Sequence, residues 1–144
     1  MRVYLDNCCF NRPFDDQLSL VIRLETEAKL HVQSLIRHGQ LDLVWSFMLD
    51  YENGANPFDE VQQQIGAWKE LAVDDCDGSD EVKATANSLM EVGLHTKDAI
   101  HIACAIHMGA DYFITTDKKI LNKSLTGIQA INPIDFIRRY FDAK

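Results

Sequence analysis

The chain has 144 residues, of which 47% are hydrophobic and 25% charged, and its formal net charge is −8. This length suits one domain with a sizeable core, so we expect a single domain over residues 1–144. The acidic balance argues against a general nucleic-acid coat, because binding to phosphates is mostly electrostatic. No apolar run is long enough to cross a membrane, and the start MRVYLDNCCF lacks a signal-peptide layout. We therefore expect a soluble cytoplasmic protein.

The cysteines predict neither a disulfide framework nor a zinc site. Cys8 and Cys9 are adjacent and would pair with each other only under strain. Together with Cys76 and Cys104 they form no C-x-x-C or Cys/His spacing of the kind that binds zinc. We expect reduced thiols that are mostly buried.

The first half of the chain predicts two strands and three helices. Residues 2–5 are β-prone and close at Asp6, before a break at 11–13. Residues 18–37 carry a helical apolar stripe that ends at Gly39. A second strand is expected at 41–46, a short helix at 47–53, and a further helix from Pro57. The buried face of that further helix is expected at Val61, Ile65, Trp68 and Leu71.

The second half continues the alternation of strands and helices. A short strand is expected at 71–74, a helix at 79–90 capped by Ser79, and a helix at 97–107 capped by Thr96. A buried strand at 112–115, a short helix at 118–125, a strand at 128–131 and a final helix from Pro133 follow. This alternation predicts a three-layer α/β/α fold with a mostly parallel sheet.

Four acidic residues fall where one edge of such a sheet is expected. Asp6 closes the first strand, and Glu52 lies on the helix that leaves the second strand. Asp98 begins a helix, and Asp117 follows a later strand. In parallel α/β layers the carboxyl ends of strands and the N-termini of the following helices share an edge, where open α/β folds place their sites. We expect the four carboxylates to face one another.

Clustered carboxylates predict a metal site. Two of them about 4 Å apart repel by ~4 kcal/mol at an effective dielectric constant near 20. A bound cation offsets this repulsion, and all-oxygen ligands favour Mg²⁺ or Mn²⁺. Water activated by such an ion can hydrolyse a phosphodiester, with a carboxylate orienting or deprotonating the water. This chemistry needs no covalent nucleophile, and the chain offers no defensible Ser/His/Asp arrangement.

The same residues resemble the PIN-domain family over nearly the whole chain. The pattern consists of Asp6 after an apolar strand, Ser46 six residues before Glu52, the run DAIHIA at 98–103, and Thr-Thr-Asp at 115–117. The resemblance implies a metal-dependent ribonuclease that cleaves RNA, often the toxin of a VapBC-type toxin–antitoxin pair. It also implies a five-stranded parallel sheet, an antitoxin protein as partner, and homodimers.

Carried over residue by residue, the acidic quartet of the family is Asp6, Glu52, Asp98 and Asp117, which would act as catalytic and metal-binding residues. Thr116 matches the hydroxyl residue beside the last acid. The family often has a small hydroxyl residue or Asn after the first acid, where this chain has Asn7 and Cys8. We expect a supporting polar contact from Asn7. The low isoelectric point is a further departure from an RNA-cutting enzyme.

Several assignments stay open at this stage. Arg12 and Lys97 are candidates for binding substrate phosphate, and Lys118, Lys119 and Lys123 also lie near the proposed site in sequence. Glu52 is the least secure of the four acids, and Glu25 or Glu27 could contribute to the site from the first helix. His101, three residues after Asp98, is expected to be packed or exposed to solvent rather than to serve the site.

Two other functions compete with a ribonuclease. One is a catalytically silent PIN-like interaction module, which the acidic surface and Cys8 favour. The other is a phosphatase with an acidic phosphoryl acceptor, which is weaker because Asp6-Asn7-Cys8 lacks the second aspartate of a D-x-D pair.

Overall fold

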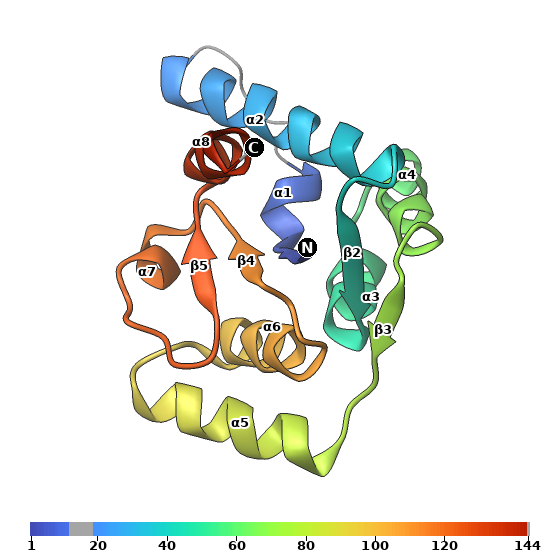
Figure 1. The fold of residues 1–144 in the computed structure, drawn as a ribbon. Coiled ribbons are helices and arrows are strands. Elements are labelled where there is room, and N and C mark those ends of the chain that lie inside the picture. Colours follow the sequence, from blue (N-terminus) through green and yellow to red (C-terminus); the bar gives the residue numbers. More distant parts are fainter. Residues whose placement is uncertain (12–18, 144) are drawn as a thin grey trace.

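The structure is a computed structural model that describes residues 1–11 and 19–143. Its centre is a five-stranded sheet in the order β3-β2-β1-β4-β5, and every neighbouring pair is parallel (Figure 1). The strands are β1 Arg2–Leu5, β2 Asp42–Ser46, β3 Asp74–Cys76, β4 Tyr112–Ile114 and β5 Gln129–Ile131. The α/β fold with a parallel sheet flanked by helices is therefore confirmed.

Helices flank the sheet and alternate with its strands along the chain. Figure 1 shows α5 packed along α6 at one side of the molecule, while α2 and α8 meet at the opposite side. The helices are α1 Asn7–Asn11, α2 Leu20–Arg37, α3 Phe47–Gly54, α4 Asp59–Lys69, α5 Asp80–Glu91, α6 Thr96–His107, α7 Lys118–Leu121 and α8 Pro133–Asp142.

Strand β1 lies in the middle of the sheet and brings the N-terminal residues into the core. Val3, Tyr4 and Leu5 are buried, as expected for a parallel strand covered on both faces. Val3 pairs with Leu43 of β2 on one side and with Tyr112 of β4 on the other. The carboxyl ends of β2, β1 and β4 therefore lie next to one another, and the residues that follow them meet at one edge of the sheet.

Short polar side chains cap several helices, and one of these caps, Ser79, is predicted from the sequence. Ser79 caps α5 by accepting a hydrogen bond from the Val82 amide. Ser46 caps α3 directly after β2, so this helix starts at the carboxyl edge of the sheet. The expected cap at Thr96 is wrong by one residue, because Thr96 is the first residue of α6 and His95 takes the cap position without a side-chain hydrogen bond.

The largest differences from the sequence-based expectations concern short elements. The strand expected at 71–74 is at Asp74–Cys76, while Leu71 and Val73 are 45% and 53% exposed. Helix α4 begins at Asp59 and ends before Leu71, so Leu71 is not part of its buried face. Helix α7 ends at Leu121 instead of residue 125. The five-residue helix α1 was not predicted, because it is too short to show a helical period.

Helix α2 holds α1 against the end of β1. Lys29 Nζ donates to the carbonyl oxygen of Cys8 at 3.0 Å, and Gln33 Nε2 donates to that of Cys9 at 3.2 Å. Both side chains are buried, so these bonds satisfy polar atoms inside the molecule. The residues directly after Asp6 are thereby fixed in place.

The cysteines are free thiols, and all except the partly buried Cys8 are buried, as expected. Within the described part of the chain, none of the helices has the length and apolar character needed to cross a membrane.

Candidate functional site

Asp6 stands at the carboxyl end of the central strand. Its amide donates to the carbonyl oxygen of Ile114 at 3.0 Å, which extends the pairing with β4 by one residue. Its side chain is 8% exposed, and Oδ1 accepts a hydrogen bond from the Asn7 amide at 2.8 Å. Burial raises the pKa of the Asp6 carboxyl above its ordinary value, and the negative charge of Glu52 adds to this effect.

Thr115 joins Asp6 to the loop after β4. The Thr115 hydroxyl donates to Oδ2 of Asp6 at 2.7 Å and accepts a hydrogen bond from the Asp117 amide at 3.0 Å. Oδ1 of Asp117 accepts from the Lys119 amide at 2.9 Å and so caps α7. The structure therefore uses Asp117 as a helix cap while directing its carboxylate to the same edge as Asp6.

Asp98 lies in the first turn of α6 and is partly buried. Burial raises the pKa of its carboxyl, and the charges of Asp6 and Asp117 raise it further. The charges of two carboxylates from other segments of the chain thus reach Asp98.

Glu52, on α3, is the fourth acid at this edge. Burial by itself would raise the pKa of its carboxyl. The hydrogen bond from His101, the charge of Lys97 and a side-chain hydrogen bond with Asn7 outweigh burial, so that the pKa is lowered. Glu52 is therefore held as a carboxylate, whereas burial and like charges favour the protonated forms of Asp6 and Asp98.

His101 contacts Glu52, which the sequence did not indicate. Its Nε2 lies 2.5 Å from Oε1 of Glu52, and its Nδ1 lies 2.5 Å from the hydroxyl of Tyr4. The ring is 1% exposed and packs edge-on against Tyr4. The expectation of a packed histidine holds, but its packing position is against a site carboxylate.

The residues next to the acids differ in what they contact. The Asn7 side chain contacts Glu52, and its Oδ1 is buried without a hydrogen-bond partner among the described residues. The hydroxyl of Thr116, expected to support the site, donates to Sγ of Cys8 at 3.4 Å. The hydroxyl that contacts Asp6 belongs to Thr115, one residue earlier, which sequence reasoning missed.

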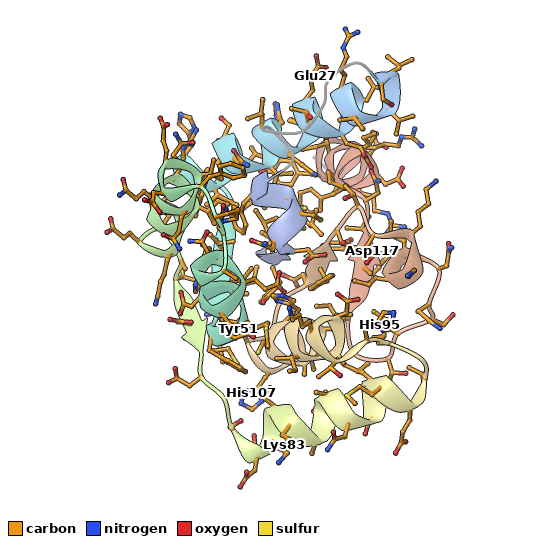
Figure 2. All side chains as sticks on the ribbon, turned by 180° about the vertical axis from the view of Figure 1, so that it is seen from behind. Glu27, Tyr51, Lys83, His95, His107 and Asp117 are labelled. Atoms are coloured by element: carbon orange, nitrogen blue, oxygen red, sulfur yellow. The ribbon has the colours of Figure 1, made fainter. Side chains whose placement is uncertain are left out.

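Positively charged side chains lie around this edge. A cavity of about 300 Å³ is lined by Asp98 together with Lys119, Lys123 and His95. Figure 2 shows His95 and Asp117 toward one side of α6 and Tyr51 toward the other. Lys97 Nζ lies 5.5 Å from the centre of the Tyr51 ring. An anion approaching the carboxylates would therefore meet cationic groups.

The remaining candidates lie elsewhere or outside the description. Glu25 accepts a hydrogen bond from Asn132 at 3.1 Å between α2 and α8, and Glu27 lies on α2 at the far end of the molecule from Tyr51 and His95 (Figure 2). Neither replaces Glu52 at this edge. Arg12, a candidate for phosphate binding, lies outside the described residues.

The donor atoms at this edge fit a hard divalent cation in kind. Within residues 1–11 and 19–143, no three His, Cys, Asp or Glu side chains are already arranged to hold a metal ion. Mg²⁺ commonly binds through one or two carboxylates and keeps several waters, so it needs no such preformed group. The partnerless Oδ1 of Asn7, beside Glu52, offers a further oxygen acceptor.

Known structures share this fold. The chain matches VapBC2 from Rickettsia felis, solved bound to a DNA fragment from its promoter, at 12% identity and a TM-score of 0.59, covering 92% of this chain and 98% of that one. It matches a toxin–antitoxin complex from Klebsiella pneumoniae at 16% identity and a TM-score of 0.61, covering 91% of this chain and 97% of that one. FitAcB from Neisseria gonorrhoeae matches at 14% identity and a TM-score of 0.58, covering 91% of this chain and 97% of that one.

The fold is PIN-like. More narrowly, the structural match is to PIN-domain toxins of the VapC and FitB kind, over more than nine-tenths of the chain and at low sequence identity. No protein-family model and no curated protein matches the sequence.

Proposed function

We propose that this chain is a metal-dependent endoribonuclease that hydrolyses RNA phosphodiester bonds at Asp6, Glu52, Asp98 and Asp117. The observation that carries this proposal is the grouping of acidic residues from separate segments at one edge of the sheet, where Thr115 contacts both Asp6 and the Asp117 amide. In keeping with this grouping, burial and the charges of Asp6 and Asp117 raise the pKa of Asp98. Repulsion between like charges is costly to the folded protein unless protons or cations offset it.

The cofactor would be Mg²⁺ or Mn²⁺, held by the four carboxylates of Asp6, Glu52, Asp98 and Asp117. When bound, it would supply an activated water and stabilise the leaving oxygen. The chain's own part is to hold these carboxylates in register. Thr115 fixes Asp6 relative to Asp117, and the low pKa of Glu52 keeps it able to accept a proton from water.

The cationic side chains favour a phosphate-bearing substrate despite the net charge of −8. Lys119, Lys123 and His95 line a cavity that shares Asp98 with the acidic edge. Lys97 lies over Tyr51, which is exposed and can stack on an RNA base. Substrate phosphates would bind these groups while the scissile phosphate meets the carboxylates.

The protein is further proposed to be the toxin of a toxin–antitoxin pair. The structures it matches include complexes described as toxin–antitoxin or VapBC assemblies, and the likeness extends over almost their whole chains. A basic antitoxin would complement the acidic surface. A homodimer is proposed on the family resemblance.

Cleavage of unstructured RNA by purified protein with Mn²⁺ or Mg²⁺ tests the ribonuclease. We expect metal-dependent cleavage that Asp98→Asn and Asp6→Asn each abolish without loss of the fold. Asp59→Asn, an exposed position in the first turn of α4, is the matched control and should cleave like the wild type. Undiminished cleavage by both site variants would contradict the mechanism.

The runner-up is a catalytically silent PIN-like interaction module. It is favoured by the absence, within the described residues, of three side chains prearranged for a metal. Titration with Mn²⁺ separates the two functions, since a ligand that binds the folded state raises its thermal stability. Stabilisation by Mn²⁺ that Asp98→Asn removes supports the enzyme, and no stabilisation together with no cleavage supports the silent module.

A further inference from the structure

A line of hydrogen bonds crosses the core from the start of α3 to the Glu52 carboxylate. The Leu49 amide donates to Oγ of Ser46 at 3.3 Å. The Tyr4 hydroxyl lies 2.6 Å from that Oγ and 2.5 Å from Nδ1 of His101. Nε2 of His101 lies 2.5 Å from Oε1 of Glu52. The line thus joins β1, β2 and α6 to one acid of the site.

This line is sheltered from water until it reaches Glu52. Tyr4 and Ser46 are fully buried and His101 is 1% exposed, whereas the Glu52 side chain is 20% exposed. Burial raises the pKa of Tyr4 well above its ordinary value, so its hydroxyl keeps its proton. Buried polar atoms must find partners inside the protein, so their arrangement is strongly constrained.

Counting donors and acceptors gives the direction of each bond. A carboxylate only accepts, so Nε2 of His101 must carry the hydrogen that faces Glu52. In a neutral ring Nδ1 then accepts from the Tyr4 hydroxyl. The Tyr4 oxygen accepts from the Ser46 hydroxyl, whose oxygen in turn accepts from the Leu49 amide. Every donor in this line has an acceptor.

We propose that His101 is a positioning residue for Glu52. Tyr4 and Ser46 hold its ring in the tautomer protonated at Nε2, and that N–H fixes one oxygen of Glu52 at the acidic edge. This inference rests on the proposed function for its catalytic meaning, although the tautomer and the orientation of Glu52 are properties of the fold.

The same geometry excludes His101 as a metal ligand. A histidine binds a metal through a nitrogen lone pair. Here Nε2 bears a hydrogen directed at Glu52, and the lone pair of Nδ1 accepts from Tyr4. His101 therefore acts on a bound cation only through Glu52, as hydrogen-bond partners of ligating carboxylates do.

Mn²⁺ affinity and RNA cleavage, measured on the same variants, test the positioning role. Loss of a partner of a metal ligand typically costs about 10–100-fold in metal affinity or activity, which is the loss expected for His101→Leu. His101→Gln, whose amide can still donate to Glu52, should recover part of it. Tyr4→Phe removes only the hydroxyl and should fall between the wild type and His101→Leu.

The matched control is His107→Gln, on the same helix and far along it from Asp98. His107 is partly exposed and lies 3.7 Å from Glu81. The His107→Gln substitution should leave Mn²⁺ affinity and RNA cleavage unchanged. If His101→Leu does not fold, as judged by thermal unfolding, Tyr4→Phe decides the outcome, because it keeps the ring that stacks on Phe113.

Nitrogen-15 NMR of the histidine ring tests the tautomer without any catalytic readout. The wild type should show His101 protonated at Nε2 and not at Nδ1, and Tyr4→Phe should show a mixture. A ring protonated only at Nδ1 would overturn the proposal. So would a folded His101→Leu protein with wild-type Mn²⁺ affinity and cleavage.

The two proposals fail in different ways. If the wild type cleaves no RNA, but His101→Leu weakens Mn²⁺ binding and the Nε2 tautomer is present, the ribonuclease is contradicted and the positioning role is supported. If the wild type cleaves RNA and neither His101→Leu nor Tyr4→Phe changes Mn²⁺ affinity or the cleavage rate, the positioning role is contradicted and the ribonuclease stands.

Discussion

The hydroxyl of Thr115 donates to Oδ2 of Asp6 at 2.7 Å, so the loop after β4 is tied directly to the carboxylate that ends β1. The hydroxyl oxygen of Thr115 also accepts a hydrogen bond from the Asp117 amide. A single buried hydroxyl therefore sets the relative position of two acids that are more than a hundred residues apart. Its loss should disturb both stability and the site.

Thr115→Val tests this tie. Valine keeps the shape of threonine but leaves Asp6 Oδ2 and the Asp117 amide without their partner. Leaving buried polar groups unsatisfied costs about 1–3 kcal/mol. For a chain of this size each kcal/mol lowers the melting temperature by about 2–4 °C. Thermal unfolding should show this loss, together with weaker Mn²⁺ binding.

Thr116→Val is the matched control, since its hydroxyl donates to the sulfur of Cys8, a weaker acceptor than a carboxylate. We expect a smaller loss of stability. An equal or larger loss of stability in Thr116→Val would show that the hydrogen bonds of Thr115 do not hold Asp6 and Asp117 together.

The raised pKa of Asp98 predicts a pH-dependent stability. Because the folded-state pKa lies above the unfolded value, the folded protein binds more protons between these two values. The contribution of Asp98 to the free energy of unfolding is therefore largest below its ordinary pKa and falls as pH rises through the raised one. Asp98→Asn removes this dependence and should stabilise the metal-free protein at neutral pH.

Thermal unfolding in the presence of a chelator, over a range of pH, measures this effect. Because Asp98 is only partly buried, solvent screening reduces the stabilisation expected from Asp98→Asn. If removing the charge repulsion raised the free energy of unfolding by about 1 kcal/mol, the melting temperature would rise by about 2–4 °C. Addition of Mn²⁺ should reverse the order, with the wild type more stable than Asp98→Asn. Lower stability of metal-free Asp98→Asn at neutral pH would argue against the repulsion.

Lys119 and Lys123 predict a salt-dependent binding of RNA. Both line the cavity beside Asp98, and within residues 1–11 and 19–143 no ion pair is formed between either lysine and a carboxylate. For single strands each phosphate contact contributes about 0.7 to the slope of log affinity against log salt. Lys119→Gln and Lys123→Gln should each lower this slope accordingly, as measured by fluorescence anisotropy with an Asp6→Asn background.

Lys69→Gln is the control for overall charge. Lys69 pairs with Asp50 at 3.0 Å and lies within 3.7 Å of Asp75, away from this cavity. If Lys69→Gln changes the slope as much as the cavity variants do, RNA binding follows net charge and not the cavity.

Gly93 sets the shape of the turn between α5 and α6. Its φ of +101° is unfavourable for other residues, and a Cβ at this position would lie 2.7 Å from Nζ of Lys123. Gly93→Ala should destabilise the protein by about 1–2 kcal/mol and displace Lys123. Gly54→Ala, in a helix with open space around it, should be neutral or stabilising in thermal unfolding. Equal effects of the two substitutions would contradict this role of the turn.

The sequence predicted the parallel fold, which the structure confirms, and it predicted Asp6, Glu52, Asp98 and Asp117 at one edge of the sheet. In a parallel sheet the carboxyl ends of all strands lie at the same edge, so residues that follow the strands can be assigned to this edge without knowledge of side-chain contacts. The edge strand β3 was misplaced because two of its three residues, Asp74 and Asp75, are exposed and give no apolar signal.

Contacts between elements could not be predicted in the same way. The helical period shows that His101 shares a face with Asp98, but not that Glu52 of α3 lies across from that face. In the same way, the run Thr115-Thr116-Asp117 does not show which hydroxyl faces Asp6. This depends on where β4 ends, and boundaries are the least certain part of a sequence-based assignment.

The amide of Asp6 donates to Ile114 in the middle of the sheet, while its side chain belongs to the acidic edge. Exchange of this amide hydrogen with solvent therefore requires opening of the central strands, which belong to the most stable part of a fold. By contrast, Lys119 and Lys123 lie on and just after the short helix α7, where local opening costs less. Local fluctuations should thus move the side chains of Lys119 and Lys123 freely while leaving the carboxylate of Asp6 in place.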